Sequence, residues 1–142
     1  MKTLTLDAEY DCDFALFGLV SSTRDYTLAW GLNRGLRLRF VRQPDFVLHL
    51  VQQGPLAFSY YLHTNEALTL RLFRNRAALP TTLSKPFLAP DIKEYDYLLQ
   101  VSGGTDELAG VELLDRLTAL PAVQYASEFD PNELKYKENL IF

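Results

Sequence analysis

Residues 36–74, LRLRFVRQPDFVLHLVQQGPLAFSYYLHTNEALTLRLFR, decide the fold class of this chain. Apolar and polar residues alternate along them, which is typical of strands with one buried face. Pro44-Asp45, Gly54-Pro55 and the connection TNEA (64–67) interrupt the alternation. The pattern predicts an antiparallel meander of four strands, at 36–42, 46–51, 57–63 and 67–74.

The flanking sequence predicts two helices and further strands. Ser22, followed three residues later by Asp25, is a variant capping box that starts a helix, and Gly35 is placed to end it. Residues 13–22 are almost continuously apolar, so they suit either a buried strand or a helix. The remaining expected elements are strands at 2–6, 94–101 and 122–129, a helix at 105–120 and a helical turn at DPNE (130–133).

This order of elements predicts one α+β domain that covers residues 1–142 and contains a mostly antiparallel sheet. A chain of 142 residues fits one compact core better than two small ones. The apolar fraction of 48% is that of a globular protein. The longest irregular segment, 75–93, contains three prolines, and loops of this length are often functional.

Charge is distributed unevenly along the chain. The net charge is −4, yet residues 34–76 carry seven arginines against Asp45 and Glu66. This basic middle segment predicts a binding surface for an anionic partner on the meander. Its expected residues are Arg37, Arg39, Arg42, Arg71 and Arg74.

The N-terminal segment MKTLTLDAEYDCDF has acids where a secretory signal needs an apolar run. No apolar run approaches the roughly 18 residues of a membrane-spanning helix. Cys12 is the single cysteine and has no partner for an internal disulfide. We therefore expect a cytoplasmic protein that makes no contact with a membrane.

Residues 88–101, LAPDIKEYDYLLQV, place three acids and two tyrosines at the start of an apolar run. On a strand that begins at 94, Glu94 and Asp96 share one face and could act as an acid and a base. The preferred interpretation is an anchor, in which Asp91 binds the backbone of the turn and the tyrosines fix the strand in the core.

Three stretches resemble the IPExxxVDY family of small bacterial proteins. Pro90, Asp96 and Tyr97 match its motif, and Asp91 keeps the acid but shortens it; Ala89 and Tyr95 depart from it. LVSSTRDYTLAWGLNRGL (19–36) resembles the first helix of the family, and DPNELKYKENLIF (130–142) resembles its end. The resemblance extends over nearly the whole chain. It implies no activity, cofactor or catalytic residue, because the family has no established one.

The residues themselves point to no catalytic centre, cofactor or metal. The two histidines, His49 and His63, each stand alone on a predicted strand, and the acidic segment DAEYDCD (7–13) lacks the glycine and distal glutamate of a calcium loop. Gly103-Gly104 precedes a helix and could hold an anion, but a turn needs glycine there in any case.

We therefore expect a non-catalytic interaction or accessory module that binds a protein or a second copy of itself. One alternative is an RNA-associated factor that uses the same arginines. Another is a small-molecule site under the 75–93 loop, lined by Trp30 and the tyrosines. The apolar end of the chain, Leu140-Ile141-Phe142, either packs on its own domain, which we prefer, or docks on a neighbour.

Overall fold

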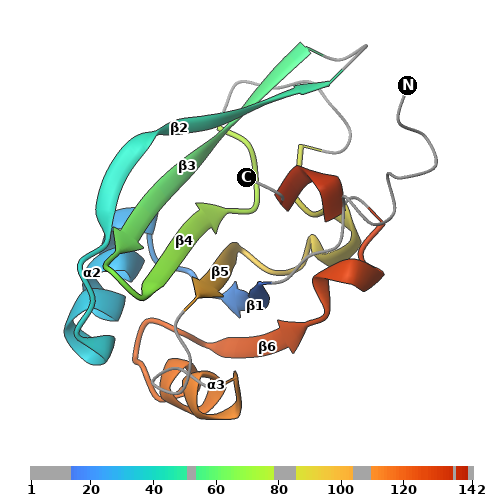
Figure 1. Cartoon of the computed structure of the whole chain (residues 1–142). Coiled ribbons are helices and arrows are strands. Elements are labelled where there is room, and N and C mark those ends of the chain that lie inside the picture. The colour runs from blue at the N-terminus through green and yellow to red at the C-terminus, as the bar shows by residue number, and fades with distance from the viewer. Residues whose placement is uncertain (1–13, 51–53, 79–85, 104–109, 136, 141–142) are drawn as a thin grey trace.

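Over the residues that it describes, the computed structural model contains one antiparallel sheet, two helices and three short 3-10 helices (Figure 1). It describes residues 14–50, 54–78, 86–103, 110–135 and 137–140. The strands are β1 (Ala15–Val20), β2 (Val41–Leu50), β3 (Gly54–Thr64), β4 (Leu68–Arg74), β5 (Tyr97–Gly103) and β6 (Tyr125–Phe129). The helices are α2 (Asp25–Leu36) and α3 (Gly110–Thr118), and the 3-10 helices are η1 (Pro90–Ile92), η2 (Pro131–Glu133) and η3 (Lys137–Leu140). The predicted α+β class is confirmed.

The strands lie in the order β2-β3-β4-β5-β1-β6, and every neighbouring pair is antiparallel. The first strand is therefore an inner one: Phe17 of β1 is paired with Leu99 of β5 on one side and with Glu128 of β6 on the other. The apolar run at 13–22, which suited a strand or a helix, contains this strand. Buried strands of this kind read as continuous apolar runs because both faces are covered.

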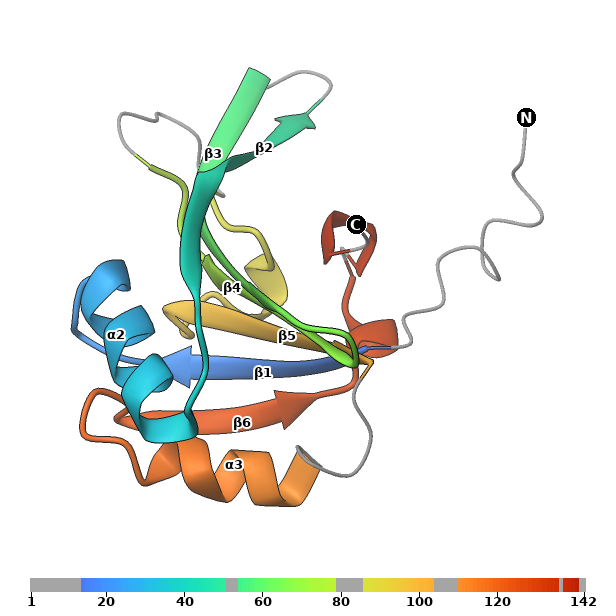
Figure 2. The ribbon, with the colours of Figure 1, turned by 60° about the vertical axis from the view of Figure 1, so that its left-hand side comes forward.

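A layer of apolar side chains covers each face of the sheet. On one face, α2 and α3 pack against the sheet through residues such as Leu32 and Leu117. On the other face, the segment 86–93 and the end of the chain contribute Leu88, Ile92 and Leu140. Figure 2 shows β1, β5 and β6 side by side above α3, with the β2–β3 hairpin rising away from them.

The meander has three strands, so the prediction of four was wrong. Residues 41–50 form a single strand, β2, in which the register shifts between Gln43 and Phe46. This irregularity accommodates Pro44 and Asp45. Pro44 is tolerated because β2 lies at the edge of the sheet, where a missing N–H need not break a ladder hydrogen bond.

Both predicted ends of the first helix were also wrong. The N-cap is Arg24, not Ser22, and no side chain caps this end. The left-handed residue at the other end is Arg37 (φ 57°), and Gly35 is still helical. Gly35 instead makes room for a neighbour, because a Cβ atom there would collide with Cδ2 of Leu120.

The remaining elements follow the sequence more closely. Asp130 caps η2 as predicted, and its carboxylate accepts a hydrogen bond from Asn132 N. The TNEA connection closes the β3–β4 hairpin, with Asn65 Oδ1 accepting from Ala67 N and Leu68 N. The strand expected from 94 begins only at Tyr97. The strand expected at 2–6, Cys12 and the acidic segment 7–13 lie outside the described residues.

The end of the chain packs on its own domain as far as it is described. Leu140 is 1% exposed, and its carbonyl accepts a hydrogen bond of 2.7 Å from the buried Gln100 side chain. Asn139 Nδ2 donates to Leu88 O at 3.1 Å. The preferred interpretation of internal packing is therefore confirmed for Leu140; Ile141 and Phe142 lie outside the described residues.

Candidate interaction surface

The outer face of α2 carries two large exposed aromatic side chains. Tyr26 is 60% exposed and Trp30 is 59% exposed. They are four residues apart, so they lie on the same side of the helix, and Arg34 follows at the same spacing. The guanidinium of Arg34 lies 4.8 Å from the centroid of the Trp30 ring, which is a cation–π contact. Leu28, Leu32 and Leu36 on the opposite side hold α2 to the core.

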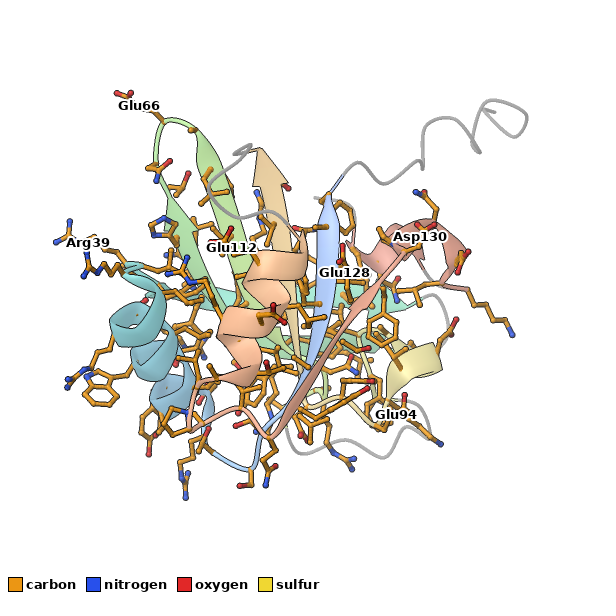
Figure 3. The ribbon with its side chains drawn as sticks, turned by 90° about the horizontal axis from the view of Figure 1, so that it is seen from below. Arg39, Glu66, Glu94, Glu112, Glu128 and Asp130 are labelled. Atoms are coloured by element: carbon orange, nitrogen blue, oxygen red, sulfur yellow. The ribbon has the colours of Figure 1, made fainter. Side chains whose placement is uncertain are left out.

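Arg37 and Arg39 extend this surface beyond the end of the helix. Both are exposed, and Figure 3 shows Arg39 beyond the end of α2, pointing away from the body of the protein. We name the set Tyr26, Trp30, Arg34, Arg37 and Arg39 the aromatic–arginine surface. It contains three positive charges and no acid.

Asp25, the one acid in residues 24–40, is turned toward the sheet. Its carboxylate lies near the Tyr61 hydroxyl. Burial, followed by this neighbouring carboxylate, raises the pKa of Tyr61 above its usual value. The Asp25 carboxylate therefore lies near Tyr61 and not among the arginines, so the net charge of the aromatic–arginine surface stays positive.

Arg42, another of the predicted arginines, lies on the same side of the sheet as α2 but is held by contacts within β2. Arg42 bonds Asp45 Oδ1 at 2.6 Å and Gln43 O at 2.9 Å. In the register of β2 and β3, Arg42 lies opposite Tyr61, on the side of the sheet that α2 covers.

Arg71 and Arg74 lie on opposite sides of β4, since side chains alternate along a strand. Arg71 pairs with Gln100 and donates to its Oε1 at 3.3 Å, whereas Arg74 pairs with Tyr97. The arginine-bearing strand face that the sequence predicts is therefore divided. Only Arg37 and Arg39 join one exposed surface.

The small-molecule site expected under the 75–93 loop does not form around Trp30. The described part of this loop packs through Leu88, Ala89 and Ile92 on the sheet face opposite α2. Trp30 projects outward from α2 on the other side. The prediction that Trp30 lines a site under this loop was wrong, because α2 and the described part of the loop cover opposite faces of the sheet.

The motif residues anchor distant segments by their side chains. Asp91 Oδ2 accepts a hydrogen bond of 2.6 Å from Lys135 N, whereas the predicted partner was the backbone of its own turn. Asp96 Oδ2 accepts from Ser21 N at 2.9 Å, and the Tyr97 hydroxyl donates to Thr23 O at 2.7 Å. Pro90 opens η1, where a missing N–H costs nothing. Burial raises the pKa of Tyr97 to about 12, so its hydroxyl stays a donor.

Asn75 is the residue that sequence reasoning missed. It is 1% exposed, and its Nδ2 donates to Ile92 O at 3.2 Å and to Tyr95 O at 3.0 Å. Its Oδ1 accepts from Ala89 N at 2.8 Å. One amide therefore fixes the whole 89–95 segment, motif included. The sequence signal is slight: an asparagine directly after a strand reads as part of a turn.

His63 is the second buried polar residue with an unusual environment. Its Nδ1 accepts from Arg39 N at 3.0 Å, while the buried Nε2 has no hydrogen-bond partner in the described part of the chain. Burial lowers the pKa of His63 below its usual value, so the ring is held neutral. His63 thereby positions the connector that carries Arg39.

The described residues contain no group of three His, Cys, Asp or Glu side chains that could hold a metal ion. None of the helices in the described part is both long and apolar enough to cross a membrane. No family model, curated protein or solved structure matches this chain.

Proposed function

We propose that this is a cytoplasmic, non-catalytic interaction module that binds an acidic protein partner through the aromatic–arginine surface. The observation that supports the proposal is the exposed Tyr26 and Trp30 pair with Arg34 stacked on Trp30. Trp, Tyr and Arg are the residues most enriched among those that dominate the energy of protein interfaces. A soluble domain has no need to expose a tryptophan beside a tyrosine for its own stability.

The charge of the surface favours one kind of partner. Three arginines stand on it, in a chain whose net charge is −4. A patch with this charge attracts acidic protein surfaces and repels basic ones. The partner would place aspartate or glutamate side chains against Arg34, Arg37 and Arg39, and an apolar groove over Trp30.

A crosslinking experiment tests the surface directly. A photoreactive phenylalanine analogue at the exposed Thr27 of α2 should capture one protein from the lysate of the producing cell, and the same analogue at the exposed Thr118 of α3 should not. Trp30→Ala and Arg34→Glu should each abolish the Thr27 product. Both side chains are exposed, so the thermal midpoint of these variants should stay unchanged.

The captured protein must also meet the charge criterion. Its purified complex should survive ribonuclease and weaken with salt, and an acid-to-arginine change on the partner should restore binding to Arg34→Glu. A product that persists in Trp30→Ala and Arg34→Glu would overturn the proposal. Loss of all product with ribonuclease would also overturn it and would favour the RNA-associated alternative, in which salt dependence is steep.

A further inference from the structure

A second feature, separate from the aromatic–arginine surface, is a cleft of about 440 Å³ beside the end of β4. One wall is the extended chain that carries Arg74 and Arg76, and Phe87 lies next to it through a bridge to Arg76. The other wall is the turn 93–96 after η1. Its size lies within the range of small-molecule sites, roughly 300 to 1,000 Å³.

The cleft contains charges of both signs that do not neutralise each other. Arg74, Arg76 and Lys93 face Glu94 and Asp96, yet the ion pair found among the described residues is Arg42–Asp45, elsewhere on the sheet.

Two contacts keep the charges apart. The guanidinium of Arg76 lies 5.4 Å from the centroid of the Phe87 ring, and the Oδ2 atom of Asp96 is occupied by Ser21 N. Arg74 and Arg76 alternate with the buried Asn75 side chain, so both project away from the core. The three cations, the Glu94 carboxylate and the Oδ1 atom of Asp96 therefore remain available to a ligand.

The walls are fixed before any ligand arrives. The turn is tied to the other wall by Asn75, whose amide bonds the carbonyls of Ile92 and Tyr95 and whose N–H bonds Asp96 O at 2.9 Å. The Tyr95 ring packs on Gly18 and lies nearly perpendicular to the Phe129 ring, at a centroid distance of 5.0 Å. A preformed site binds with less loss of conformational entropy than one that must be ordered.

We propose that this cleft binds a nucleoside monophosphate. Two guanidinium groups and an ammonium group suit a doubly charged phosphate better than a single carboxylate. The Glu94 carboxylate and the Oδ1 atom of Asp96 accept hydrogen bonds from the ribose hydroxyls, and the half-buried Tyr95 residue lines the cleft where the base would lie. The proposal is independent of the proposed function, because it uses none of the residues of the aromatic–arginine surface.

Calorimetric titration of the full chain with adenosine 5′-monophosphate tests this site. Ribose 5-phosphate, adenosine and inorganic phosphate serve as part-ligands, and each should bind more weakly than the whole nucleotide. Arg74→Gln and Lys93→Ala should each weaken nucleotide binding by about tenfold, the effect of losing one charge-assisted hydrogen bond. Neither change should affect adenosine to the same degree.

The carboxylate side has its own test. Glu94→Gln should reduce the preference for adenosine 5′-monophosphate over its 2′,3′-dideoxy analogue, because an amide accepts the diol more weakly. Figure 3 places Glu94 beside η1, at the surface, so this change should leave the thermal midpoint unaltered. Arg34→Ala on α2 is the matched control and should bind the nucleotide as the unchanged chain does.

Two results would overturn the proposal. One is the absence of binding at millimolar nucleotide. The other is equal binding of inorganic phosphate and the nucleotide, which would mean a site for any small anion.

A 5′-phosphorylated tetra-adenylate tests whether the ligand is a free nucleotide or the end of an RNA chain. If it binds more tightly than the mononucleotide through Arg74 and Lys93, the site is supported and the nucleotide belongs to the end of an RNA chain. If it binds less tightly, the site is supported for a free nucleotide.

Discussion

The side chain of Asn75 and the backbone of Ala89 are bonded in both directions across a separation of 14 residues. Ala89 N donates to Asn75 Oδ1 at 2.8 Å, and Asn75 Nδ2 donates to Ala89 O at 3.5 Å. Backbone hydrogen bonds from Leu88 N to Asn75 O and from Asn75 N to Asp96 O complete the arrangement. The described part of the 75–93 segment is thus built around one buried amide, and its irregular appearance in the sequence conceals an ordered structure.

Asn75→Ala should lower the free energy of unfolding by about 3 kcal/mol, because it leaves several buried backbone groups without a partner. Asn75→Asp should be at least as destabilising, since a carboxylate would face the carbonyl oxygens of Ile92 and Tyr95. Urea unfolding measures both. Asn139→Ala, which removes one bond to Leu88 O, is the control and should cost about 1 kcal/mol. A loss no larger for Asn75→Ala than for this control would contradict the assigned role.

Gly18→Ala should destabilise the protein by about 1–3 kcal/mol through overpacking. A Cβ atom at Gly18 would lie 2.7 Å from Tyr95 Cδ1 and 2.8 Å from Phe129 Cε2. Gly31→Ala is the matched control: its Cβ would meet Ala122 Cβ at an ordinary 3.7 Å, and alanine favours the helix, so stability should rise by up to about 1 kcal/mol. Thermal unfolding of the two variants should therefore move in opposite directions.

Lowering the pH should reduce the free energy of unfolding, because His63 becomes protonated. The pKa of His63 is lowered in the folded protein, so folding favours the neutral ring. This contribution to stability is complete above the unfolded pKa of about 6.5 and is lost as the pH falls below it toward the folded value. Protonation would also remove the acceptor for Arg39 N.

His63→Gln separates this effect from general acid denaturation. Glutamine can still accept a hydrogen bond but does not titrate, so the variant should lose less stability than the unchanged chain between pH 7 and pH 5. Urea unfolding at several pH values gives the comparison, with His49→Gln as the control for removing a histidine elsewhere. Parallel pH profiles for the unchanged chain and His63→Gln would contradict the prediction.

Arg37→Gly should keep or raise stability by up to about 1 kcal/mol, because Arg37 has a positive φ of 57° that glycine adopts without strain. The same change removes a charge from the aromatic–arginine surface and should weaken binding of the acidic partner. Unfolding and binding measured on this one variant therefore separate the two roles. A destabilised Arg37→Gly would show that its side chain, and not only its backbone, supports the end of α2.

Alternation of apolar residues was sufficient to predict a mostly antiparallel sheet and the β3–β4 hairpin, and capping signals with helical spacing predicted the two helices, since these features depend on local sequence. The ends of α2 could not be predicted in this way. Gly35 reads as a helix stop, but packing against Leu120, which is 85 positions away, decides its role. Pro44 reads as a break because the sequence does not say that β2 lies at an edge.

The candidate surface was predicted only in part for the same reason. In the sequence, Arg37 and Arg39 continue the alternation of a strand, yet Arg37 is the C-cap of α2 and Arg39 follows it in the connection to β2. Arg71 and Arg74 are three residues apart, and strand geometry alone places them on opposite faces. The cleft brings together 74–76, Phe87 and 93–96 through Asn75, whose side-chain partners no periodicity reveals.

The position of β1 between β5 and β6 has a consequence for folding during synthesis on the ribosome. The β2–β3–β4 meander joins neighbours in the chain and can pair as soon as it is made. β1 is synthesised before any of these strands, but its two partners end at Gly103 and Phe129. Its apolar side chains must therefore wait until almost the whole chain has emerged, a period in which a nascent strand is open to wrong partners and to chaperones.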